Sequence, residues 1–330
     1  YAFNKAHAVC YAVVAYQTAY LKCHYPRQYM AALMTSVIDN PKKVAEYILV
    51  CRNMGIEILP PDINEGESGF SVSGSSIRYA LTAIKSVGRP VITAVVEERK
   101  ERGPFLNLQD FVNRITDKDV NKRAVESFIK AGALDGLGGT RKQFMSVFSQ
   151  VMDRTQKDRK NNMAGQPSLF DIVEEEEKEG LALKLPDVGE YPKEMKLAFE
   201  KEVLGIYVSG HPLEEYEAAW RKKISNTTAD FAYDEEVQGV RVKDGAKAVI
   251  GGLIAGKTIK YTKDNKIMAF LTIEDLVGTV EVIVFPKTYE QSASFLTEDA
   301  KVFVQGRISV EEDKDGKLIC EKIVPFTELK

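Results

Sequence analysis

From about Ala246 to the end of the chain, five short runs of residues alternate between apolar and polar side chains, and this pattern restricts the possible fold more than any other feature. Alternation with a period of two is typical of strands that bury one face. A helix-like insert, PKTYEQSASFL, separates the third run from the fourth. Five strands with a helix at this point have the order of the OB fold, so we predict a five-stranded OB-fold β-barrel over residues 245–330.

The first 160 residues have a mainly helical pattern instead. A short helix, a glycine-containing turn and a longer helix follow one another around residues 84–100, and a related pattern returns over 121–148. We interpret the two patterns as tandem helix-hairpin-helix units. The predicted fold class is therefore a multidomain α plus β protein, with an all-α first part and the OB-fold β-barrel at the end.

Charge is distributed unevenly along the chain. Residues 72–160 carry 17 Lys and Arg against 10 Asp and Glu, whereas residues 166–220 carry 5 against 14. A basic segment next to an acidic one suggests that the first meets a polyanion and the second does not.

The turn of the first helix-hairpin-helix unit has the composition of a phosphate-binding corner. Gly88 permits a tight turn, and the following helix presents unpaired backbone N–H groups that attract a phosphate without reading a base. A purely structural corner between two helices is the alternative. The residues expected at duplex DNA are Lys85, Ser86, Val87, Gly88 and Arg89 in the first unit, and Gly138, Arg141 and Lys142 in the second.

An OB barrel binds single strands through aromatic stacking and basic loops. Lysines crowd the first loop of the predicted barrel, and Phe270 lies on an alternating strand where it could instead belong to the core. The residues expected at single-stranded DNA are Lys257, Lys260, Tyr261, Lys263, Lys266, Phe270, Phe285 and Arg307.

Residues 5–24 are mostly apolar and predict a buried helix, in which Cys10 would be a small buried hydrophobe. Lys5 and His7 stand at its start, where a cation could meet a phosphate, although a packing or capping role for His7 is the more ordinary interpretation. The four cysteines form no C-x-x-C pair, and His7, Cys10, Cys23 and His24 match no known zinc spacing. We therefore predict no disulfide framework, which fits a reducing compartment, and no metal site.

The segment NNMAGQPSLFDIVEEEEKEG, residues 161–180, has no helical or alternating period, yet it carries Leu169 and Phe170 side by side. We interpret the segment as a linker whose apolar pair is reserved for a pocket on another protein.

The sequence contains no motif of a P-loop, a zinc protease or a serine hydrolase. Paired carboxylates for two metal ions, which nucleotidyl transfer requires, are not recognisable on any predicted strand. No apolar run is long enough to span a bilayer, and no secretory signal is present, so no membrane partner is expected.

Several long stretches together resemble one family. AYQTAYLKCHYP, ILPPDIN, IRYALTAIKSVG, IKAGALDGLG and EKEVLGIYVSGHPLEEY closely resemble, in this order, the C-terminal half of the DNA polymerase III alpha subunits, the C-family replicative polymerases of bacteria. The resemblance covers nearly the whole chain and implies a bacterial, cytoplasmic protein of the nucleoid.

The resemblance also implies a division of the chain. Residues 1–66 would end a fingers domain, 67–160 would be the tandem helix-hairpin-helix region on duplex primer-template DNA, and 161–187 a linker. Residues 188–244 would be a helical connector and 245–330 the OB-fold domain on single-stranded template. Lys5 and His7 match the family's Phe-Asn-Lys-Ser-His motif, in which they would help bind the nucleotide; Ala6 replaces its Ser, and Ser86 replaces the usual first Gly of the hairpin turn.

Three further expectations follow from the resemblance. QPSLF matches the family's clamp-binding peptide at Gln166, Leu169 and Phe170, which predicts the β sliding clamp as a partner, with other replisome subunits possible. The catalytic carboxylates and their Mg²⁺ belong to a palm domain before Tyr1. This chain alone, with no catalytic residue and no cofactor of its own, is therefore expected not to act as a DNA-directed DNA polymerase. A non-catalytic DNA-binding module of a repair or helicase-associated protein is the alternative function.

Overall fold

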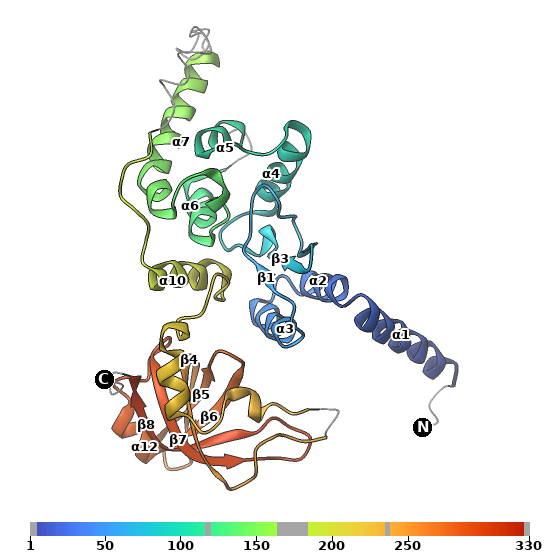
Figure 1. The fold of residues 1–330 in the computed structure, drawn as a ribbon, viewed down its shortest axis with the longest axis vertical. Helices are drawn as coiled ribbons and strands as arrows, with labels where there is room; N and C mark the ends of the chain where they lie inside the picture. The colour runs from blue at the N-terminus through green and yellow to red at the C-terminus, as the bar shows by residue number, and fades with distance from the viewer. Residues whose placement is uncertain (1–4, 116–119, 164–183, 235–237, 327–330) are drawn as a thin grey trace. The chain divides into compact units, whose positions relative to one another are not determined.

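The computed structural model of the chain describes residues 5–115, 120–163, 184–234 and 238–326. These residues form two compact units, Tyr1–Gly210 and His211–Lys330 (Figure 1). Unit 1 is mainly helical and unit 2 contains a closed barrel, which confirms the predicted multidomain α plus β class. Within the described ranges, no helix combines the length and the apolar character needed to cross a bilayer.

Unit 1 consists of helices around a small sheet. Its helices are α1 (Lys5–His24), α2 (Pro26–Ser36), α3 (Pro41–Asn53), α4 (Arg89–Arg102), α5 (Leu108–Ile115), α6 (Lys122–Ala131), α7 (Arg141–Met163) and α10 (Lys193–Leu204). Two 3-10 turns, η1 (Leu81–Ala83) and η2 (Asp135–Leu137), precede α4 and α7. The sheet has the order β1 (Ile58–Leu59), β3 (Ser76–Arg78), β2 (Ser71–Ser73).

Local sequence signals explain where these helices begin and end. The Asn40 side chain accepts a hydrogen bond from the backbone N–H of Lys43 at the start of α3, and Asn121 does the same for Ala124 in α6. Asn is among the residues that best satisfy the free N–H groups of a first turn. Gly132, with φ of 78°, ends α6 in the left-handed conformation that glycine adopts without strain.

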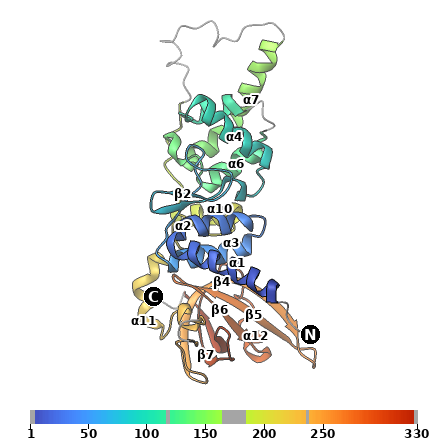
Figure 2. The same ribbon diagram turned by 90° about the vertical axis from the view of Figure 1, so that its right-hand side faces the viewer.

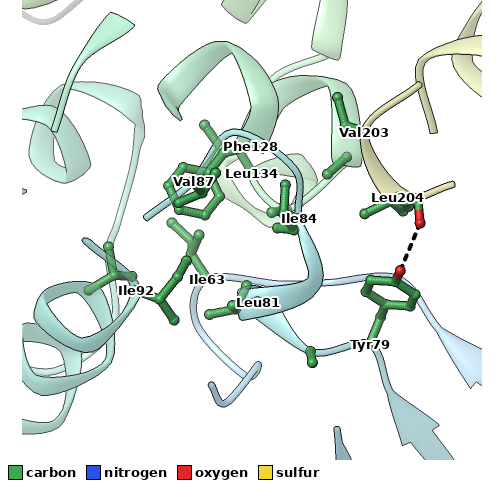
Figure 3. Packing of buried hydrophobic residues seen from close by; sticks show 14 of the residues in the cluster. Ile63, Tyr79, Leu81, Ile84, Val87, Ile92, Phe128, Leu134, Val203 and Leu204 are labelled. Atoms are coloured by element: carbon green, nitrogen blue, oxygen red, sulfur yellow. Dashed lines mark hydrogen bonds between the residues drawn. The ribbon is translucent and has the colours of Figure 1, made fainter. Parts of the chain in front are cut away.

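The core of unit 1 joins the two helix-hairpin-helix regions. Figure 3 shows Ile84 and Val87 of the first turn close to Phe128 of α6 and Leu134 after it. All four side chains are buried, at 8% exposure or less. The two hairpins therefore share one apolar interior rather than forming separate bodies.

Helix α10 packs against this core through Val203 and Leu204. Carbonyl groups at its C-terminus and just after it accept hydrogen bonds from three other segments of unit 1. Tyr79 Oη donates to Leu204 O at 3.0 Å (Figure 3). Lys85 N donates to Val203 O at 2.8 Å, and Arg52 Nη2 donates to Tyr207 O, three residues after α10, at 2.8 Å. Burial raises the pKa of the Tyr79 phenol, which keeps the group a neutral donor.

The region expected to be one helical connector, residues 188–244, is divided between the units. Its first part, including α10, belongs to unit 1, and the part from His211 onward belongs to unit 2. There α11 (Glu217–Lys223) packs on the barrel, since Trp220 is fully buried and its Nε1 donates to Gly251 O at 2.7 Å.

Unit 2 is a closed five-stranded barrel (Figure 2). Its strands are β4 (Lys247–Tyr261), β5 (Ile267–Glu274), β6 (Thr279–Val284), β7 (Lys301–Ser309) and β8 (Lys317–Pro325). The strand order around the barrel is β4-β5-β6-β8-β7, and α12 (Pro286–Ser292) lies in sequence between β6 and β7. Strand count, helix position and closure are those predicted for an OB fold.

The expectation that residues 5–24 form a buried helix is half wrong. The helix exists as α1, but nearly all of its residues are exposed, including Val14 at 57% and Tyr16 at 69%. Cys10 and Cys23 are exposed as well. The all-round apolar pattern, which normally means burial, was interpreted correctly as a helix. Among the described elements, α1 packs mainly against α2, which leaves most of its surface exposed.

Candidate nucleic-acid interface

The first hairpin turn alternates between buried anchors and exposed groups. Ile84 and Val87 insert into the core, whereas Lys85, Ser86, Gly88 and Arg89 are exposed. The anchors fix the turn, and the backbone bond from Lys85 to Val203 holds it against α10. Among the five residues predicted here, Val87 is therefore a packing residue, and the other four form one exposed polar surface.

Ser86 adopts a left-handed backbone conformation, which glycine takes most easily. Its φ is 66°, a region where a side chain costs about 1–2 kcal/mol. The serine side chain is exposed, so a hydroxyl group stands where a glycine would offer only backbone.

Gly88 immediately precedes α4 and is not required by the interior of unit 1. Its φ of −71° suits any residue, and a Cβ placed on it would meet only Pro90 Cδ, at 3.6 Å. No side chain caps the first turn of α4. Pro90 has no N–H group, and Ile92 N donates to Gly88 O at 3.2 Å, so the backbone donors left at this helix start are Arg89 N and Val91 N. With no side chain at the cap, a phosphate has room to approach them closely.

Arg89 is held by an ion pair with Asp39, with both carboxylate oxygens 2.9 Å from Nη2. The two side chains are 66% and 86% exposed. Exposed pairs of this kind contribute little to stability, so a phosphate could displace the carboxylate at small cost.

The second hairpin differs, and the expectation for Arg141 is corrected. Its side chain is only 3% exposed, and its guanidinium contacts Asp135 at 2.9 Å and the fully buried Glu200 at 3.0 Å. Glu200 also accepts backbone hydrogen bonds from Val208 and Ser209. A guanidinium enclosed by two carboxylates in the core is not available to a DNA phosphate.

The start of α7 already holds an anion of its own. The carboxylate of Glu190 accepts from the backbone N–H of Arg141 at 3.3 Å and from that of Lys142 at 3.2 Å. Gly138, with φ of 77°, remains exposed and open, but Lys142 is half-buried. Of the two hairpins, only the first presents an uncapped helix start.

On the barrel, aromatic and basic side chains share the outer face of β4 and β5. In the strand register Thr258 faces Phe270 and Lys260 faces Met268, which places all four on one side. Lys260 Nζ lies 4.7 Å from the centre of the Phe270 ring. Phe285, directly after β6, is 46% exposed. Tyr261 is 66% exposed, but it faces Ile267 in the register, so its side chain lies on the opposite side of the strand pair from Lys260 and Phe270. Lys263 and Lys266 are exposed in the turn between β4 and β5.

Two residues predicted for this surface lie elsewhere. Lys257 faces Leu271 in the register and its Nζ donates to Leu296 O at 2.7 Å, so it satisfies an interior carbonyl group. Arg307 belongs to β7, which does not border β5 or β6, and its Nε pairs with Glu321 at 2.8 Å. The exposed surface on β4 and β5 therefore does not include these two cations.

Lys5 and His7 are exposed in the first turns of α1, and the His7 ring lies 4.7 Å from that of Tyr11. The residues predicted to bind the clamp, Gln166, Leu169 and Phe170, lie outside the described residues.

Sequence reasoning did not identify the buried pair between Arg141 and Glu200, although a signal exists. Leu197, Glu200 and Leu204 recur at helical spacing on the buried side of α10. A carboxylate inside an apolar stripe indicates a buried charge that needs a partner.

Comparison with known proteins finds two families of nucleic-acid interest along the chain and relatives that match nearly all of it. The family described as helix-hairpin-helix motif matches residues 55–144, and the family described as OB-fold nucleic acid binding domain matches residues 248–326. DNA polymerase III subunit alpha of Borreliella burgdorferi is 37% identical over 330 residues, which is 100% of this chain and 28% of that protein. The chain is homologous to a segment of DNA polymerase III subunit alpha.

Other relatives of the same name span distant bacteria. The subunit of Saccharopolyspora erythraea is 39% identical over 316 residues, covering 94% of this chain and 26% of that protein, and that of Thermus aquaticus is 37% identical over 100% of this chain and 26% of its own length. The chain thus spans about a quarter of the length of these relatives. Among solved structures, an asparaginyl-tRNA synthetase from Pyrococcus horikoshii matches 26% of the chain at 25% identity with a TM-score of 0.22, too low to carry an argument.

Proposed function

We propose that this chain is the DNA-binding part of a bacterial replicative DNA polymerase, the DNA-directed activity of which belongs to the whole protein. Homology to DNA polymerase III subunit alpha supports the polymerase, and the two matched families support nucleic-acid binding. The observation that carries the proposal is the uncapped start of α4, flanked by exposed Lys85 and Arg89.

Duplex DNA would be held by its backbone at the first hairpin. A phosphate oxygen would accept from the free N–H groups of α4, while Lys85 and Arg89 supply positive charge and Ser86 a hydroxyl donor. Arg89 would exchange Asp39 for the phosphate. Contacts of this kind position a duplex without selecting a sequence, as a replicative enzyme requires.

Single-stranded template would lie on the outer face of β4 and β5. Bases would stack on Phe270 and on the exposed ring of Phe285, because stacking tolerates any base. Lys260 and the lysines of the following turn would meet the phosphates.

The catalytic and tethering groups would lie outside the described residues, whereas Lys5 and His7 belong to the described α1. The catalytic carboxylates and Mg²⁺ would come from another part of the polymerase, so the chain alone would not extend a primer, and Lys5 and His7 would contribute to nucleotide binding there. QPSLF would tether the protein to the sliding clamp through Leu169 and Phe170, since an exposed apolar pair in a polar segment suits a pocket on a partner.

A binding titration tests the duplex proposal. Fluorescence anisotropy of a labelled 20-base-pair duplex would compare the wild-type chain with K85E and with K142E in the second hairpin. We expect K85E to weaken binding about tenfold or more and to make the salt slope shallower by about 1, as expected for one lost phosphate contact. K142E should change affinity less than twofold; equal effects of the two variants would contradict the assignment to the first hairpin.

A further inference from the structure

The barrel carries a second surface, separate from the aromatic face of β4 and β5. An open pocket of about 230 Å³ lies on the outer side of β4, β7 and β8, next to the last turn of α11. It is lined by Lys223, Val249, Phe303, Gln305, Lys322 and Val324.

Strand register shows how this pocket is built. Val249 faces Gln305, which in turn faces Lys322, so these three residues form one row across β4, β7 and β8. Phe303 faces Val324 in the adjacent row, next to Gly251. The pocket is therefore set in the sheet itself, on strands that fix the spacing of its walls.

The floor of the pocket is apolar but offers no ring face for stacking. Phe303 is only 8% exposed, and its ring stacks on Phe326 with 4.2 Å between centroids and 13° between planes. A Cβ placed on Gly251 would come within 2.7 Å of the same ring, so that side is also covered. An aliphatic side chain can pack against such a floor, whereas a nucleic-acid base requires an open ring face.

The rim of the pocket is basic. Lys223 and Lys322 stand on opposite elements, α11 and β8, and the lining contains no acidic residue. The Nζ of Lys322 has no carboxylate partner in the part of the chain that the structure describes, and the side chain is exposed. Gln305 adds an amide that can both donate to and accept from a peptide backbone.

We infer that this pocket binds an acidic peptide of a partner protein, one that carries a bulky aliphatic side chain between carboxylates. The aliphatic side chain would pack on Phe303, Val249 and Val324, and the carboxylates would pair with the two lysines. The contrast with the β4 and β5 face supports a peptide over a nucleic acid. Beside that face, directly after β6, the ring of Phe285 is 46% exposed, whereas the aromatic residue in this pocket, Phe303, is only 8% exposed.

A peptide titration tests the inference on the full chain. The probe is a fluorescein-labelled hexapeptide of aspartates with one central leucine, measured by anisotropy in 0.15 M salt, the ionic strength at which exposed charges are largely screened beyond about 8 Å. We expect K322E to weaken binding about tenfold and K266E, an equally exposed lysine on the other face, to leave it within twofold. Replacement of the peptide's leucine by alanine should also weaken binding.

Three results would overturn the inference. Equal losses in K322E and K266E would mean attraction to net charge alone. Binding that does not depend on the leucine would remove the apolar floor from the argument. Displacement of the peptide by oligothymidylate, with the same K322E loss for the oligonucleotide, would make the pocket a second nucleic-acid surface.

Discussion

The two hairpin turns of unit 1 begin from the same motif and reach opposite electrostatic states. In the first, the start of α4 has no cap, and its flanking cations Lys85 and Arg89 are exposed. In the second, Glu190 occupies the start of α7 and Arg141 is enclosed by carboxylates. A helix-hairpin-helix pair can therefore use one copy for a ligand and the other to hold the fold together.

The difference arises from segments distant in sequence. The buried carboxylate that pairs with Arg141 is Glu200 of α10. The carboxylate at the start of α7 is that of Glu190, which lies in the segment just before α10. The first turn meets α10 through the backbone bond from Lys85 N to Val203 O and through the buried Ile84 side chain, and it receives no carboxylate from that helix. The two turns therefore differ in that the second receives carboxylates from Glu190 and from Glu200 of α10, whereas the first receives none from this region.

The largest expected effect is on the buried pair. R141A should lower the free energy of unfolding of unit 1 by about 3–5 kcal/mol, because it leaves Glu200 charged and unpaired in the core. Urea denaturation followed by helical circular dichroism measures this loss. Trp220 is the only tryptophan and belongs to unit 2, so its fluorescence transition is an internal control. A comparable shift of both transitions would contradict a defect local to the second hairpin.

A pair of glycine variants compares the two turns more finely. G132A should destabilise unit 1 by about 2 kcal/mol or more, because φ is 78° and the new Cβ would lie 2.2 Å from Arg141 Nη2. G88A should change stability by less than about 0.5 kcal/mol, since its φ is ordinary and the space is open. It should nevertheless weaken duplex binding in anisotropy. Normal duplex binding by G88A would remove the argument for close phosphate approach.

The smallest effect concerns backbone strain. S86G should raise the free energy of unfolding by up to about 1 kcal/mol, because glycine adopts φ of 66° without steric penalty. Thermal or urea unfolding measures the gain, and S86A, which keeps the Cβ but not the hydroxyl, is the matched control. A loss of stability in S86G alone would mean that the serine hydroxyl stabilises the turn.

The sequence predicted best what depends on local pattern. The alternation of apolar and polar residues around Phe270 predicted the barrel strands, and helix patterns separated by glycine-containing turns predicted both hairpins. It predicted poorly what depends on distant partners: Arg141 and Arg89 look alike in sequence, yet only Arg141 meets a carboxylate from α10. Lys257 and Lys260 likewise differ only by which side of β4 they occupy, which the strand register decides. The exposure of α1 depends on which other elements pack against it, and the apolar pattern of its own residues does not reveal that.

The three carbonyl groups near the end of α10 have a mechanical consequence. They tie together Arg52 of α3, Tyr79 next to the small sheet, and the first hairpin turn. A pull on DNA held at that turn would pass through the backbone of Lys85, not its side chain, into α10 and on to α3. Tension in the duplex would then be transmitted through these hydrogen bonds toward the N-terminal helices, with little change in the shape of the turn itself.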